Sequence, residues 1–127
     1  MTVGIVLVSH SPAMAAGLAE LLSQLAPDAP VAVAAGTDDG RLGTSPDAVV
    51  HALTVADRGD GVVVLPDLGS AVLSVRVALE DFDTERFVLV DAPFVEGAVS
   101  ATVTAGTGAS LAEVVAAALE ARTVAKF

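Results

Sequence analysis

His10 is the residue most suited to nucleophilic chemistry, because it ends an apolar run and directly precedes Ser11 and Pro12. A neutral imidazole has one nitrogen whose lone pair can attack an electrophile and one N–H group that another residue must hold. A carboxylate is the usual partner of that N–H group, because it fixes the tautomer and raises the basicity of the other nitrogen. His10 is therefore a candidate nucleophile if the fold brings a carboxylate to it.

The leading candidate for that carboxylate is Asp67, which follows a second apolar run in Pro66-Asp67-Leu68-Gly69-Ser70. A phosphoryl group on the other nitrogen of His10 would meet helix N-termini, whose free N–H groups and dipoles favour anions. Hydroxyl and glycine residues at the starts of predicted helices and loops could complete the phosphate site. These residues are Ser11, Gly36, Thr37, Gly69 and Ser70.

Four apolar runs without alternation predict the strands that position these residues. Such runs are typical of parallel strands that are covered on both faces. The predicted strands span residues 3–8, 31–35, 61–65 and 87–91. Helical patterns follow at residues 12–26, 47–57 and 70–80, after Pro93, and from Ser110 onward. The order of elements predicts an open α/β sheet with helices on both faces and strand order 2-1-3-4, as one domain over residues 1–127.

The helix predicted at residues 12–26 has an apolar stripe with spacing typical of one helix face. The stripe consists of Met14, Leu18, Leu21, Leu22 and Leu25. Ligands of open parallel sheets bind beyond the carboxyl ends of the strands. His10, Gly36 and Asp67 all follow strand ends, so we expect them at the same edge of the sheet.

Composition excludes several classes of function. The net charge of −10, with only six Lys and Arg residues, argues against nucleic acid or an anionic membrane as partner and favours a basic protein. The absence of cysteine excludes disulfides and thiolate chemistry. The first basic residue is Arg41, so a signal peptide's charged region is missing, and a cytoplasmic location is expected. No metal site is predicted, because the acidic residues are interpreted as solvated surface.

Structural interpretations of the same residues compete with the functional ones. A histidine at a strand end is commonly a surface or capping residue, and Asp67 could simply form a turn. The second histidine, His51, lies inside a predicted helix and is interpreted as structural. The glycine-rich fingerprints of dinucleotide-binding and P-loop proteins are absent, which argues against a stand-alone nucleotide-binding domain.

Four segments in order along the chain resemble one known family. They are VGIVLVSHS at residues 3–11, AGTDDGRLGTS at 35–45, GDGVVVLPDLGSA at 59–71 and DAPFVEGA at 91–98. They resemble the phosphotransferase subunit (DhaM) of phosphoenolpyruvate-dependent dihydroxyacetone kinase. The amino-terminal domain of that subunit is similar to the IIA domain of mannose-type phosphotransferase systems (PTS). Some family members continue into HPr-like and enzyme I-like domains.

The resemblance implies an enzyme function, as a homodimeric phosphoryl carrier. His10 corresponds to the histidine phosphorylated on its tele nitrogen, Nε2, and Asp67 to the aspartate that orients it. The loops that contain Gly36, Thr37, Gly69 and Ser70 correspond to those around the phosphoryl group. The implied donor is phospho-HPr, and the implied acceptor is ADP held with magnesium on the subunit DhaL. The resulting ATP would phosphorylate dihydroxyacetone bound to the subunit DhaK. This chain itself is expected to bind no cofactor.

Two alternatives remain open. The chain could be the IIA component of a mannose-family sugar PTS, which passes its phosphoryl group to a IIB partner. It could also be a non-enzymatic regulatory module whose histidine only reports the phosphorylation state.

Overall fold

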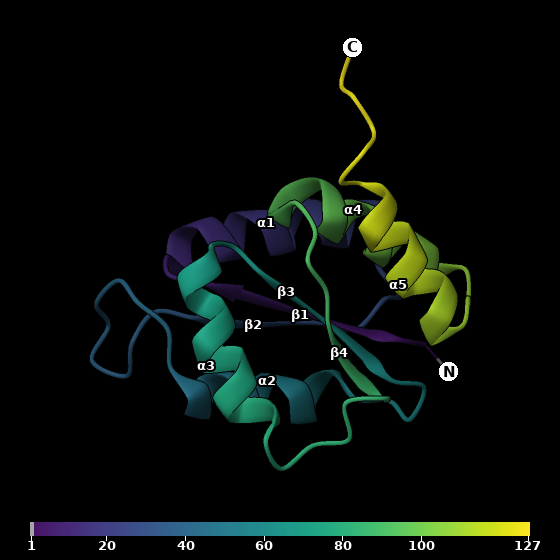
Figure 1. Cartoon of the computed structure of the whole chain (residues 1–127). Coiled ribbons are helices and arrows are strands. Elements are labelled where there is room, and N and C mark those ends of the chain that lie inside the picture. The colour runs from purple at the N-terminus through teal and green to yellow at the C-terminus, as the bar shows by residue number, and fades with distance from the viewer. Residues whose placement is uncertain (1) are drawn as a thin grey trace.

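The computed structural model describes residues 2–127 as four parallel strands sandwiched between two layers of helices (Figure 1). The sheet order is β2-β1-β3-β4, which confirms the predicted fold class and strand order. The strands are β1 (Gly4–Ser9), β2 (Val31–Ala35), β3 (Val62–Pro66) and β4 (Phe87–Leu89). The helices are α1 (Pro12–Leu25), α2 (Pro46–Ala56), α3 (Gly69–Leu79), α4 (Phe94–Gly106) and α5 (Leu111–Glu120).

Two apolar cores lie on the two faces of the sheet, because successive side chains of a strand point to opposite faces. Val6 and Val8 of β1 contribute to the core under α2 and α3. Ile5 and Leu7 contribute to the core under α1, α4 and α5. Figure 1 shows these two helix layers above and below the sheet. Because both faces are covered, all six residues of β1 are buried.

Helix starts are set by local capping. The Ser11 hydroxyl accepts a hydrogen bond from the Met14 amide at the start of α1, and the Ser45 hydroxyl does the same for Ala48 at the start of α2. Each serine precedes a proline, which suits the first helical position because its missing N–H would be unpaired there anyway. α1 therefore begins two residues after His10, and its start is fixed close to the end of β1.

The register of the sheet brings the strand ends level. Ser9 pairs with Ala35 across β1 and β2, and Val8 pairs with Pro66 across β1 and β3. The residues that follow, His10, Gly36 and Asp67, therefore leave the sheet at one edge. Figure 1 shows the starts of α1 and α3 and the loop after β2 at this edge.

Most predicted strand and helix bounds lie within one residue of the observed ones, and two larger differences occur. β4 ends at Leu89 rather than at residue 91. Only Leu18 and Leu22 of the α1 stripe are buried, whereas Met14, Leu21 and Leu25 are exposed. A helix on an open sheet buries a narrow face, and Ala15 completes that face together with Leu18 and Leu22. Among residues 2–127, no helix has the length and apolar character needed to cross a membrane.

Candidate active site

The centre of the site is the contact between His10 and Asp67. His10 Nδ1 lies 2.9 Å from Asp67 Oδ1, although the two residues are 57 positions apart in the chain. The carboxylate is almost fully buried, whereas 26% of the His10 side chain is exposed. An ionised carboxylate can only accept, so Nδ1 carries the proton and the Nε2 lone pair is left for chemistry. The structure therefore places His10 and Asp67 together as the sequence predicted.

Asp67 is held ionised by donors around its carboxylate. Burial by itself raises the pKa of Asp67, but hydrogen bonds outweigh this effect and bring the pKa below its ordinary value of 3.8. The donors are the His10 amide, the His10 ring N–H, the Leu68 amide and the Ser9 hydroxyl. A carboxylate fixed in this way can orient the imidazole and compensate a positive charge on it.

Ser9 is a site residue that the sequence analysis did not single out. It is fully buried at the end of β1, and its hydroxyl lies 3.1 Å from Asp67 Oδ2 and 3.2 Å from the Ser11 carbonyl oxygen. The same hydroxyl accepts a hydrogen bond from the Ser11 amide. The available signal was a hydroxyl residue that ends an otherwise apolar buried strand, since buried hydroxyls need partners.

Ser70 faces the other ring nitrogen. Its hydroxyl lies 2.9 Å from His10 Nε2, and it is the second residue of α3. Since Nδ1 carries the proton, the Ser70 hydroxyl donates to the Nε2 lone pair. The positive end of the α3 dipole is therefore beside the nitrogen that would carry a phosphoryl group. Gly69, the first residue of α3, leaves open space where a side chain would stand.

The other predicted phosphate-binding residues have local contacts. The Ser11 hydroxyl caps α1, as described above. Gly36 has φ of +77°, and a side chain there would press against Pro12, so glycine is required for the chain to pass the start of α1. The Thr37 hydroxyl interacts with Asp39 and with the backbone of Arg41 inside its own loop. None of these three residues has a hydrogen bond to the His10 ring.

The loop between β2 and α2 is fastened to the site at two points. The Gly43 amide donates to the His10 carbonyl oxygen over 3.0 Å. The Thr44 and Ser74 hydroxyls lie 2.6 Å apart and join the loop to α3. Ser74 is one helical turn after Ser70, so the loop and α3 are joined close to the nitrogen Nε2.

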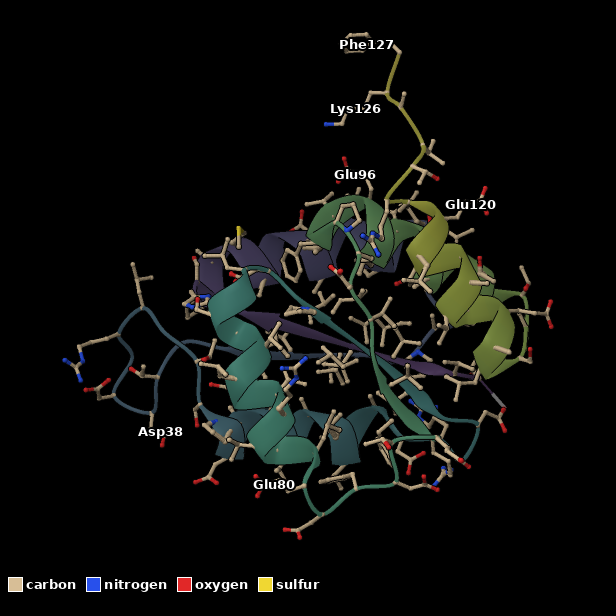
Figure 2. All side chains as sticks on the ribbon, in the orientation of Figure 1. Asp38, Glu80, Glu96, Glu120, Lys126 and Phe127 are labelled. Atoms are coloured by element: carbon tan, nitrogen blue, oxygen red, sulfur yellow. The ribbon has the colours of Figure 1, made fainter. Side chains whose placement is uncertain are left out.

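Positive charge is scarce around the site. Arg41 is the basic residue of the β2–α2 loop, and its Nε lies 2.8 Å from Asp39. Figure 2 shows acidic side chains on widely separated parts of the molecule, among them Asp38, Glu80, Glu96 and Glu120. Within residues 2–127, no group of three or more His, Asp or Glu residues is arranged to hold a metal ion. Arg41 is thus already paired, and the compensation that this chain offers a phosphoryl group on His10 comes mainly from the start of α3.

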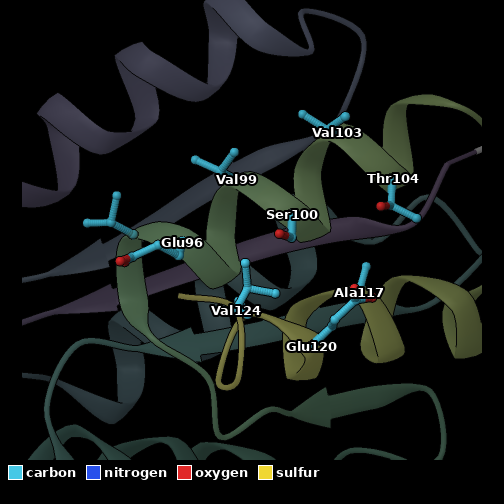
Figure 3. A pocket seen from close by; sticks show the side chains of 10 residues that line it. Glu96, Val99, Ser100, Val103, Thr104, Ala117, Glu120 and Val124 are labelled. Atoms are coloured by element: carbon cyan, nitrogen blue, oxygen red, sulfur yellow. The ribbon is translucent and has the colours of Figure 1, made fainter. Parts of the chain in front are cut away.

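Two clefts of the molecule have the volume to hold a small ligand. A cleft of about 410 Å³ lies beside Asp67, between α3 and the end of β4, and is lined in part by Arg76 and Asp91. A larger groove of about 580 Å³ lies between α4 and α5, with mainly valine and alanine walls and the acids Glu96 and Glu120 (Figure 3). The larger groove contains the hydroxyls of Ser100 and Thr104 but no histidine, and none of its lining residues has a hydrogen bond to the His10 ring. The chemistry is therefore assigned to the exposed edge at His10.

Comparison with known proteins finds one family along most of the chain. The model of the family EIIA-man, described as the PTS system fructose IIA component, matches residues 4–115. A phosphoryl donor subunit DhaM of PEP-dependent dihydroxyacetone kinase from Listeria innocua is 38% identical over 95 residues, which is 75% of each chain. The DhaM subunit of Lactococcus lactis is 36% identical over 87% of this chain and 88% of its own. A DhaM relative from Escherichia coli is 38% identical, but the match spans only 25% of that longer protein.

Solved structures repeat the fold. A crystal structure of a protein of unknown function has a TM-score of 0.84 and 32% identity, and the match covers 100% of this chain and 99% of the other. The dihydroxyacetone kinase of C. freundii in complex with AMP-PNP and Mg²⁺ has a TM-score of 0.68 over 96% of this chain and 25% of its own. At 18% identity, that likeness concerns the fold alone. The chain belongs to the mannose-type IIA (EIIA-man) family of PTS components, in which its relatives include DhaM phosphoryl donor subunits.

Proposed function

We propose that the chain is the phosphoryl carrier of a PEP-dependent dihydroxyacetone kinase, with His10 as the residue that is transiently phosphorylated on Nε2. The observation that carries the proposal is the environment of the two nitrogens of the His10 ring. Its Nδ1 is held by the buried Asp67, while its Nε2 points to an exposed edge beside Ser70. The relatives named as phosphoryl donor subunits support the choice of this system among those that use phosphohistidine.

The first step is transfer from a phosphohistidine of the donor, proposed to be HPr. The Nε2 lone pair attacks phosphorus and forms a new P–N bond, while the bond to the donor nitrogen breaks and its electron pair stays with the donor imidazole. The His10 ring then carries positive charge, which the Asp67 carboxylate compensates through the Nδ1 proton. The Ser70 hydroxyl releases the Nε2 lone pair and donates instead to a phosphoryl oxygen.

The second step delivers the phosphoryl group to ADP. A β-phosphate oxygen of the nucleotide attacks phosphorus, the P–Nε2 bond breaks, and its electron pair returns to Nε2. We propose that ADP and magnesium are held by the partner subunit DhaL. The ATP formed there then phosphorylates dihydroxyacetone bound to DhaK. Phosphoryl transfer needs in-line positioning and charge compensation, and the shortage of cations at His10 favours partners that supply the positive charge.

We also propose that the chain is a homodimer, as the resemblance implies. The surface available for this contact is the mainly apolar groove between α4 and α5, whose lining residues have no hydrogen bond to the His10 ring. It includes the exposed side chains of Val95 and Val103 on α4 and of Val124 beyond α5. Burial of this surface between two copies leaves Nε2 accessible. Sedimentation of the purified chain should give the mass of a dimer, and a monomer at micromolar concentration would contradict the proposal.

Phosphorylation with purified HPr, enzyme I and labelled phosphoenolpyruvate tests the proposed carrier function. The wild type and the control variant His51→Ala should take up the label, and His10→Ala should take up none while it remains folded. His51 is the matched control because it is an exposed histidine of α2. Label on a histidine of His10→Ala would remove His10 from its proposed role.

The acceptor is identified by the fate of the label. Labelled protein should lose its phosphoryl group when DhaL with ADP and DhaK with dihydroxyacetone are added. Transfer to a IIB component would instead favour the sugar PTS alternative. Retention of the label with every acceptor would favour the regulatory module.

A further inference from the structure

A pair of hydroxyls joins the β2–α2 loop to α3 close to the reactive nitrogen. The side-chain oxygens of Thr44 and Ser74 lie 2.6 Å apart, although the two residues are 30 positions apart in the chain. Within residues 2–127, no other hydrogen bond connects this loop to α3. Both residues are half-buried, so water competes only in part for their hydroxyls. The pair can therefore fix the position of one element against the other.

Thr44 is itself held in place between β1 and α2. On one side, the Gly43 amide donates to the His10 carbonyl oxygen over 3.0 Å. Gly43 has φ of +145°, and a side chain there would come within 2.7 Å of the Thr37 methyl carbon, so glycine permits this path. On the other side, the buried Ser45 caps α2. The Thr44 hydroxyl is thus fixed relative to His10 on the side of the loop.

The start of α3 lacks the local cap that α1, α2 and α5 have. Its N-cap residue is Leu68, whose side chain has no atom that can accept a hydrogen bond, whereas a serine caps each of the other three helices. The free amides of an uncapped first turn leave the helix start less firmly held. Ser70 and Ser74 lie one turn apart, and residues four apart share one face of a helix. Thr44 therefore holds the face of α3 that carries Ser70.

The position of that face matters for the chemistry at His10. The Ser70 hydroxyl lies 2.9 Å from Nε2, where it would donate to a phosphoryl oxygen after transfer. Ala71 and Val75 bury the opposite side of α3 in the core, but apolar packing has no preferred direction and permits small shifts of the helix. A shift of about 1 Å at a reacting group can cost a large factor in rate. A directional contact one turn from Ser70 limits such a shift.

We propose that Thr44 and Ser74 are positioning residues, whose hydroxyl pair holds the start of α3 so that the Ser70 hydroxyl stays at His10 Nε2. Neither residue has a hydrogen bond to the His10 ring, so both act through Ser70. This inference rests on the proposed function and adds to it the residues that maintain the geometry of phosphoryl transfer.

Removal of either hydroxyl, in Thr44→Val or Ser74→Ala, tests the pair. The rate of phosphoryl uptake at saturating phospho-HPr should fall about 5- to 20-fold in each variant, while the concentration of phospho-HPr at half-saturation should change by less than about twofold. The double variant should be no slower than the single ones, because all three lack the same contact. Thr44→Ser keeps the hydroxyl and should recover the rate. The matched control is Thr54→Val, which removes a hydroxyl that donates to a carbonyl within α2 and should leave the rate unchanged.

A variant without the Ser70 hydroxyl shows whether the pair acts through Ser70. Ser70→Ala is expected to be slow already, so adding Thr44→Val should lower the rate by less than about twofold more. The ¹⁵N spectrum of unphosphorylated His10 gives a second readout that needs no phosphoryl donor. The Nε2 resonance of Thr44→Val should move in the same direction as in Ser70→Ala, because the hydrogen bond to Nε2 is weakened in both. Thr44→Ser and Thr54→Val should keep the wild-type resonance.

Three outcomes would overturn the positioning role. If Thr44→Val lowers the free energy of unfolding but leaves the rate and the Nε2 resonance unchanged, the pair is only structural. If Thr44→Ser stays as slow as Thr44→Val, the hydroxyl is not the group that acts. If the losses in Thr44→Val and Ser70→Ala multiply in full, the pair does not act through Ser70. Failure of phospho-HPr to label the wild type would instead contradict the proposed function, and the ¹⁵N comparison would still decide the positioning role.

Discussion

Asp67 and Asp39 lie in two loops at the same edge of the sheet, and each has a pKa below the ordinary value of 3.8. The causes differ. For Asp39, the main cause is the hydrogen bond from the Thr37 hydroxyl, and the carboxylate is largely exposed. For Asp67, burial opposes ionisation, and donors from β1 and the β3–α3 turn overcome it.

The difference lies in what each carboxylate connects. The partners of Asp39 belong to its own loop, so its contacts shape residues 37–41 and little else. The partners of Asp67 join the end of β1 to the start of α3, across 57 positions of sequence. An exposed local contact contributes little stability, whereas a buried carboxylate with several donors fixes the relative positions of the elements it joins. Only the second kind of contact can orient a nucleophile.

The largest contrast is expected in phosphoryl uptake by Asp67→Asn and Asp39→Asn. An asparagine at position 67 has one acceptor oxygen for four donors, and an amide that faces Nδ1 would move the ring proton to Nε2. Uptake from phospho-HPr should fall about 10- to 100-fold, as is typical for residues that orient a reactive histidine. Asp39→Asn should stay within about twofold, because its carboxylate is screened by solvent. Rapid-quench labelling measures both rates.

Equal rates of phosphoryl uptake in Asp67→Asn and Asp39→Asn would contradict the claim that only Asp67 orients His10. The imidazole tautomer is an independent check. ¹⁵N spectra should show the proton of neutral His10 on Nδ1 in the wild type and in Asp39→Asn, with a shift toward Nε2 in Asp67→Asn. An unchanged tautomer would assign the loss of rate to another cause.

The sequence predicted the contact between His10 and Asp67 because parallel strands end at one edge of the sheet and both residues follow buried strands. The register, in which Val8 pairs with Pro66, places them side by side. Ser9 was missed because its position at the end of an apolar strand indicates a buried hydroxyl but not which groups that hydroxyl contacts. That network exists only after β1, β3 and α1 have come together.

The apolar pattern of α1 did not predict correctly which of its large side chains are buried. Met14 has the spacing of a core residue relative to Leu18, yet it is exposed at the site. An alanine-rich helix can bury a narrow face of small residues and leaves larger ones outside, so periodicity alone does not separate core from contact surface. The role of Thr37 was equally hidden, since its hydroxyl has partners in its own loop that depend on the loop's conformation.

The second contrast concerns stability as a function of pH. The folded-state pKa of Asp67 is depressed, so its contribution is complete above the ordinary value of 3.8 and is lost as pH falls through the lower, folded-state value. Asp67→Asn should cost about 1–3 kcal/mol of unfolding free energy near neutral pH, because buried donors lose their acceptor. Urea unfolding at pH 6.5 and at pH 3 should show the gap to the wild type narrowing at the lower pH. A gap that widens on acidification would contradict the depressed pKa.

The smallest contrast is expected between the hydroxyl of Ser9, which donates to Asp67, and the hydroxyl of Thr37, which donates to Asp39. The variants Ser9→Ala and Thr37→Val test it. Ser9 is fully buried, and its removal leaves the Ser11 amide without an acceptor and Asp67 with one donor fewer. We expect a loss of about 1–2 kcal/mol in the free energy of unfolding for Ser9→Ala and less than about 0.5 kcal/mol for Thr37→Val. Ser9→Ala should also alter the His10 ¹⁵N spectrum, because Asp67 loses a donor, and Ser9→Thr, which keeps the hydroxyl, should restore it. Were Thr37→Val to destabilise the protein more than Ser9→Ala, the loop after β2, and not the end of β1, would be the element that maintains the site.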